Sequence, residues 1–176
     1  MKGHVSKRTA LVVATLALAL AANADAKPKS QARAKPQAGP SVSILSDATR
    51  LTQMQAGHID LKAEIRDPEL TCALADGKAK SKLSFWVKSA ISPNSDIAPR
   101  NVPYFVAIIS EGQVIGKEVF DLAIPFADGT RKLSVKEKVA HIDIPVAAGK
   151  TAEDYSVTIG FQLTEEQVKY NRTASR

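Results

Sequence analysis

The sequence predicts a mainly β protein, an immunoglobulin-like antiparallel β-sandwich of seven or eight strands with a short C-terminal helix. Apolar side chains recur at every second position along most of residues 41–163, as they do in strands with one buried face. Turn motifs separate these segments, and a helix-capping motif stands near the C-terminus. A small closed β-barrel is the alternative arrangement of the same strands.

Apolar and polar side chains alternate in three segments, residues 58–66, 82–91 and 155–163. Successive side chains of a strand point to opposite faces, so each segment predicts a strand with one face in the core. Residues 132–144 also alternate, but their apolar positions change from odd to even numbers near Val139. One extra residue must be accommodated there, so we expect a bulge or a break between two short strands.

Val102 to Ser110 is apolar on both faces and predicts a central strand. Glu111-Gly112 separates it from another apolar segment, which is typical of a hairpin. Asp76-Gly77 and Asp128-Gly129 predict two further tight turns. Near the C-terminus, Thr164 and Gln167 have the spacing of a capping box, which predicts that a short helix starts there.

The first 26 residues have the pattern of a secretory signal peptide: a basic start, an apolar run of 13 residues and the segment Ala24-Asp25-Ala26. A membrane-spanning helix needs roughly 20 apolar residues, so we expect cleavage after Ala26 or Ala24 rather than an uncleaved anchor. The basic start and the compact apolar run favour bacterial export, which predicts a periplasmic protein with no integral membrane segment after cleavage.

Residues 27–40 are rich in proline, alanine and lysine and lack large apolar side chains, so we expect a disordered basic linker. Residues 41–176 are long enough for a single β-sandwich domain with its own core. A solvated linker without a partner is the simpler interpretation of residues 27–40, but four cations there would allow weak contact with an anionic membrane. These are Lys27, Lys29, Arg33 and Lys35.

The net charge of +6 does not by itself indicate nucleic-acid binding. The leader and linker carry seven of the 24 basic side chains and one of the 18 acidic ones. Residues 41–176 therefore hold 17 of each sign and are neutral overall. A neutral domain lacks the domain-wide basic field of nucleic-acid-binding proteins, so we expect no nucleic-acid partner.

The tripeptide His-Ile-Asp occurs twice, at His58 to Asp60 and at His141 to Asp143. Residues i and i+2 of a strand share a face, so two neighbouring strands would bring together ligands suited to zinc or copper. Both isoleucines fit the core face, which places His58, Asp60, His141 and Asp143 on the wet face. The favoured interpretation is ordinary solvent-facing alternation with no metal or other cofactor, and a metal site is the alternative.

No sequence motif of a nucleophilic or metal-dependent enzyme occurs in the chain, so we expect no catalytic residues and no enzymatic activity. Cys72 is the single cysteine, and its small and apolar neighbours favour burial over pairing between chains. Trp86 points away from the apolar face of its segment. We expect the C-terminal helix or the N-terminal strand to cover its side chain, or the side chain to be exposed and to contact a partner.

The segments GFQLTEEQVKYNR and VPYFVAIIS…GKEVFDLAIPF resemble those of an uncharacterised group of proteobacterial envelope proteins, many of them predicted lipoproteins. The resemblance covers most of the chain from Ser41 onward and implies no particular activity. No cysteine follows the leader directly, so the lipid anchor of that group is in doubt here. Taken together, the sequence predicts a non-catalytic periplasmic module that interacts with an unknown envelope protein. A metal-binding or metal-delivery domain is the alternative.

Overall fold

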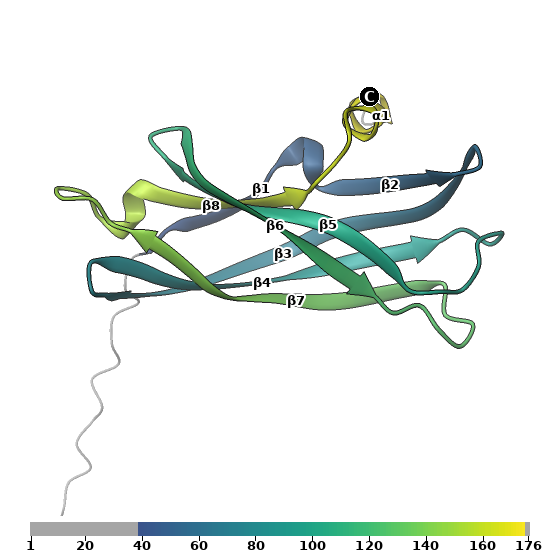
Figure 1. Cartoon of the computed structure of the whole chain (residues 1–176), viewed down its shortest axis with the longest axis horizontal. Coiled ribbons are helices and arrows are strands. Elements are labelled where there is room, and N and C mark those ends of the chain that lie inside the picture. The colour runs from purple at the N-terminus through teal and green to yellow at the C-terminus, as the bar shows by residue number, and fades with distance from the viewer. Residues whose placement is uncertain (1–38, 175–176) are drawn as a thin grey trace, which may run out of the picture. The chain divides into compact units, whose positions relative to one another are not determined.

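Eight strands form two four-stranded sheets, which lie one in front of the other in Figure 1. Sheet A has the order β1-β8-β5-β6 and sheet B the order β2-β3-β4-β7. The computed structural model describes residues 39–174, so the predicted leader and residues 27–38 of the predicted linker lie outside the described residues. The elements are β1 (Ser41–Ile44), η1 (Ser46–Ala48), β2 (Arg50–Gln55), β3 (His58–Ala75), β4 (Lys78–Ile91), β5 (Arg100–Ser110), β6 (Gln113–Ile124), β7 (Lys132–Pro145), η2 (Ala152–Asp154), β8 (Tyr155–Phe161) and α1 (Glu165–Ala174).

The predicted β-sandwich with a short terminal helix is confirmed, and the two open sheets contradict the closed-barrel alternative. The sequence predicted an immunoglobulin-like sandwich, and the structure shows its two packed sheets; periodicity alone predicts no strand order. All neighbouring strands are antiparallel except β1 and β8, which run parallel. The apolar segment from Val102 onward is the central strand β5, between β6 and β8, as predicted.

The core lies between the two sheets and follows the predicted alternation. In β4 every odd-numbered residue from Ala79 to Ile91 is buried, because that face meets sheet A. The Phe85 ring packs edge-on against Tyr104, with 5.3 Å between ring centroids. Tyr104 in turn stacks on Phe120 at 5.3 Å, so one aromatic row joins β4, β5 and β6.

Turns and bulges set where this alternation begins and ends. Asp76 and Gly77 both have positive φ, 54° and 70°, as expected for the tight turn between β3 and β4. The register between β4 and β7 shifts between Ser81 and Leu83, opposite Ile142 and Val139. This is the bulge that the parity change near Val139 predicts, and it lets both halves of β7 face the core.

The capping box of α1 is confirmed by two hydrogen bonds. The Thr164 backbone N–H donates to Gln167 Oε1 at 2.9 Å, and the Gln167 N–H donates to Thr164 Oγ1 at 3.3 Å. The helix then lies against β2 and η1, where Gln167 Nε2 donates to the Thr52 carbonyl and Arg172 pairs with Asp47 at 2.7 Å. The helix therefore does not cover Trp86, and the prediction that the C-terminal helix covers this residue is wrong.

Candidate functional site

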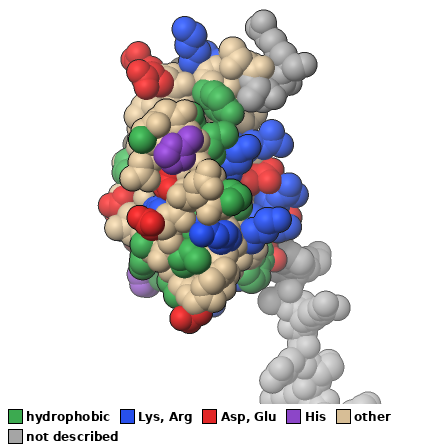
Figure 2. Space-filling model, turned by 90° about the vertical axis from the view of Figure 1, so that its right-hand side faces the viewer, with side chains coloured by type: hydrophobic (Ala, Val, Ile, Leu, Met, Phe, Trp, Pro, Cys, Tyr) green, Lys and Arg blue, Asp and Glu red, His purple; other side chains and the backbone are tan. Residues whose placement is uncertain are grey.

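The outer face of sheet B carries most of the positive charge of the domain. Ten of the 17 Lys and Arg side chains from Ser41 onward are exposed there, and the acidic side chains that pair with them are Glu64, Glu69, Asp76 and Asp143. Figure 2, an end-on view, shows Lys and Arg gathered along one side of the domain. We call this surface the basic face, and its cations are Arg50, Lys62, Arg66, Lys78, Lys80, Lys82, Lys88, Lys132, Lys136 and Lys138.

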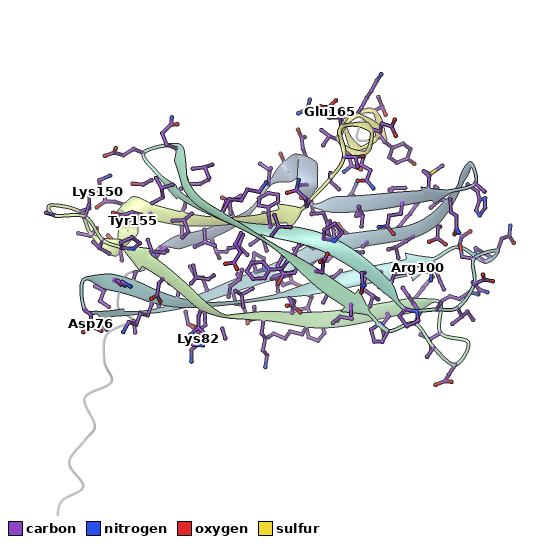
Figure 3. All side chains as sticks on the ribbon, viewed as in Figure 1. Asp76, Lys82, Arg100, Lys150, Tyr155 and Glu165 are labelled. Atoms are coloured by element: carbon purple, nitrogen blue, oxygen red, sulfur yellow. The ribbon has the colours of Figure 1, made fainter. Side chains whose placement is uncertain are left out.

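The lysines reach one face because they occupy alternate positions of paired strands. Lys78, Lys80 and Lys82 take the outward positions of β4, between buried residues. Figure 3 shows the Lys82 side chain pointing away from the sandwich. The domain is neutral overall, as expected, but its basic and acidic side chains are separated in space. A count of net charge cannot reveal this separation.

A groove of about 1120 Å³ crosses all four strands of the basic face and ends against helix α1. Lys62 and Lys132 are both register partners of Ala90, so two cations flank a small side chain at the floor. Tyr170 of α1 lines the helical end of the groove. The groove is therefore an open concavity with basic sides, a small-residue floor and one aromatic wall.

Several cations of the basic face have no acidic partner among residues 39–174. Glu64 is already bound by Arg66 at 2.8 Å and by Arg50 at 3.6 Å. The lysines without an ion pair are Lys62, Lys82, Lys88, Lys132 and Lys138. Lys62, Lys88 and Lys132 of this set line the groove, so the groove attracts anions.

Trp86 lies on the same face, two residues from Lys88 along β4. Its register partners are Arg66 on β3 and Lys136 on β7, and Lys136 Nζ lies 5.8 Å from the centroid of its ring. The side chain is 39% exposed. An aromatic ring among cations offers a partner apolar area next to charge, the combination typical of interface hot spots.

No family model, curated protein or solved structure matches this chain. None of the helices in the described part of the chain is long and apolar enough to cross a membrane. What the basic face does is therefore inferred from its geometry and charge.

The two His-Ile-Asp segments lie at opposite ends of sheet B. Asp143 pairs with Lys80, which pairs with Ala73 near the end of β3, whereas His58 begins that strand. At about 3.3 Å per residue the two segments are roughly 50 Å apart. Residues 39–174 contain no cluster of three or more potential ligands, so the geometry gives the metal-binding alternative no support.

Asp60 does not face solvent, and its predicted position on the wet face is wrong. The register of β2 and β3 shifts between Gln53 and Met54, so Asp60 is an unpaired bulge residue and turns inward. Arg100 holds its carboxylate through two hydrogen bonds, Nε to Oδ2 at 3.0 Å and Nη2 to Oδ1 at 3.1 Å. This pair fastens the segment before β5 to the start of β3. His58, His141 and Asp143 are exposed as expected.

The Asp60–Arg100 pair makes stability sensitive to acid. Hydrogen bonds from Arg100 lower the pKa of Asp60 below its usual value of about 3.9, against the opposing effect of burial. A lowered folded-state pKa contributes stability that is complete above the unfolded pKa and is lost as pH falls through the folded pKa.

Urea unfolding should show that the free energy of unfolding falls more between pH 7 and pH 3 for the native protein than for Asp60→Asn. Equal decreases for the two proteins would mean that the Asp60–Arg100 pair does not cause the acid sensitivity.

Cys72 is half-buried against the core and is not fully buried as expected. The buried Tyr104 hydroxyl donates to Glu137 Oε1 at 3.0 Å, and burial together with this carboxylate raises the pKa of Tyr104 well above its usual range. The neutral phenol is therefore a structural donor, since ionisation would place a second negative charge beside Glu137.

Proposed function

We propose that this chain is an exported, non-catalytic periplasmic module of the cell envelope that binds an acidic segment of a partner protein along its basic face. The observation that carries the proposal is the groove flanked by Lys62 and Lys132, which have no ion-pair partner in residues 39–174. Anionic side chains placed there would gain contacts that the domain itself does not supply.

The shape of the groove favours a peptide segment over a flat membrane surface. Its four strands span about 14 Å between the outer two, at 4.8 Å per strand spacing, which is room for roughly four extended residues. Lys62 and Lys132 are two strand spacings apart, so about 10 Å separates their backbones. Acidic side chains two residues apart on an extended segment share one face and lie roughly 7 Å apart, a distance that the flexible lysine side chains can accommodate. A bilayer cannot follow a concave groove in the same way.

The predicted leader and the predicted linker support the envelope location. A signal peptide over residues 1–26 would deliver the domain to the periplasm. After cleavage, residues 27–40 would remain as a basic N-terminal tail of the exported domain. The resemblance of two sequence segments to proteobacterial envelope proteins is part of the same proposal and agrees with this location. The accessory role is part of this proposal and rests on the groove as a binding surface.

The proposal predicts that a fluorescent peptide of alternating glutamate and alanine binds the purified protein and that added salt weakens the binding. Lys88→Glu should reduce the affinity at least about tenfold, because it places a carboxylate beside Glu64 in the groove. Lys169→Glu on α1 changes the net charge equally, lies outside the groove and is the matched control. Fluorescence anisotropy measures peptide binding to the native protein and to both variants. Trp86→Ala tests whether the exposed tryptophan ring contacts the bound peptide.

Two outcomes would overturn the proposal. Equal losses for Lys88→Glu and Lys169→Glu would mean that net charge rather than the groove attracts the peptide. Tighter binding to anionic lipid vesicles or to a single-stranded oligonucleotide than to the peptide, with the same dependence on Lys88, would assign the basic face to a different class of partner.

A further inference from the structure

The two sheets leave four edge strands, and three of them are protected. β1 is four residues long, and β2 is short and flanked by α1. β7 carries outward lysines along its first half, which repel an approaching copy of the same strand. β6 is different, because it is a twelve-residue edge that exposes apolar side chains.

Three large apolar side chains of β6 are more than half exposed. The exposed fractions are 61% for Val114, 53% for Ile115 and 52% for Val119. A long apolar edge strand presents unpaired backbone groups together with a hydrophobic surface, which is the arrangement that accepts another strand. This edge belongs to sheet A, so it is separate from the basic face.

The residues around Val119 are complementary to themselves when the strand is reversed. Lys117 and Asp121 stand two residues before and after it, and all three side chains take the outward positions of β6. In an antiparallel pair of β6 strands centred on Val119, each Lys117 lies directly opposite the Asp121 of the other copy. The two central valines then face each other. Lys117 Nζ donates to Gln162 Oε1 at 2.9 Å within one copy, so it would turn from this amide to the Asp121 carboxylate of the other copy, a charged and therefore stronger acceptor.

We propose that β6 is the interface with a second copy of this chain, paired antiparallel with Val119 on the two-fold axis. The two copies of sheet A form one continuous eight-stranded sheet. The bulge at the Ile108/Ile109 register shift limits regular pairing to the part of β6 after Ile115. Of the three exposed apolar side chains, Val119 therefore lies inside the paired segment, and Val114 and Ile115 lie beyond its end. Pairing over so few residues buries less than the roughly 1,200 to 2,000 Å² of a stable interface, so the dimer should be weak and its population should depend on concentration.

Sedimentation velocity of the purified protein over a range of concentrations tests the dimer. The native chain should show a reversible monomer–dimer equilibrium, and Val119→Lys should weaken it at least about tenfold by placing two lysines opposite each other. Met54→Lys is the control, since Met54 is 56% exposed on β2 and lies on the other sheet. A native protein that stays monomeric throughout, or equal effects of the two substitutions, would overturn the proposal.

The register has its own test. Asp121→Lys should weaken the dimer, and the added substitution Lys117→Asp should restore it, because the opposite charges then face each other again. In a Cys72→Ser background, Val119→Cys should form an intermolecular disulfide under mild oxidation, whereas Asp121→Cys should not, because only residue 119 faces itself. A dimer without charge rescue, or equal cross-linking at both positions, would contradict this pairing. Circular dichroism confirms that each variant is folded.

Discussion

Replacing Arg100 with alanine should lower the free energy of unfolding by about 3 to 5 kcal/mol, because Asp60 would be left buried without a counter-ion. The side chains of Asp60 and Arg100 are 8% and 17% exposed, so solvent screens their interaction only weakly. Arg100 also donates to the carbonyls of Ala98 at 2.8 Å and Asp96 at 3.1 Å. Its loss therefore also frees the segment that leads into β5, which lies at the right-hand end of the domain in Figure 3.

Urea unfolding followed by circular dichroism measures this effect. The matched control is Arg172→Ala, whose partner Asp47 lies in an exposed ion pair, so it should cost less than about 1 kcal/mol. The double variant Asp60→Leu with Arg100→Met should recover much of the loss, since apolar replacements remove both buried charges together. A change for Arg100→Ala no larger than that for Arg172→Ala would show that Asp60 is solvated in the folded protein.

Alternation in the sequence predicted the layers of this fold, because burial in a sheet is a property of each residue and its neighbours. The odd-numbered core positions of β4 and the change of parity in β7 are both visible in the sequence and both correct. The capping box of α1 is likewise local. Where α1 packs is not local, and so the sequence did not reveal that it lies on η1 and leaves Trp86 open.

The sequence did not reveal two features of the candidate site, for different reasons. Asp60 occupies a polar position in an alternating segment, and only the pairing of β3 with β2 produces the bulge that turns it toward Arg100. The basic face had a signal in the sequence, namely lysines at alternate positions of residues 78–82. A count of net charge does not contain this information, whereas a count for each predicted strand face would have found the excess.

Substituting Gly160 with alanine should lower the free energy of unfolding by about 1 to 3 kcal/mol through overpacking. An added Cβ would lie 2.7 Å from the Cβ of Ala48 and 3.0 Å from the Phe105 ring. Gly160 lies in the central part of sheet A, opposite Phe105 on β5, and η1 packs over it through Ala48. The backbone of η1 would have to move, because alanine has no flexible side chain with which to relieve the contact.

Gly116→Ala is the matched control, because it is the same substitution in a strand of the same sheet. Its added Cβ would meet Ile108 Cδ1 at 3.5 Å, an ordinary van der Waals contact, so its effect on thermal unfolding should be small. Ala48→Gly added to Gly160→Ala should recover part of the lost stability by removing the shortest contact. Equal losses for the two glycine substitutions would rule out the close approach of η1.

The same substitution connects the core to the basic face. Asp47 of η1 pairs with Arg172 of α1, and α1 forms the helical wall of the groove through Tyr170. A displaced η1 should therefore move this wall, and Gly160→Ala should weaken binding of the acidic peptide without changing any charge. Because Gly116→Ala leaves η1 in place, it should bind the peptide like the native protein. Unchanged peptide affinity in a destabilised Gly160→Ala would show that the groove does not depend on the position of α1.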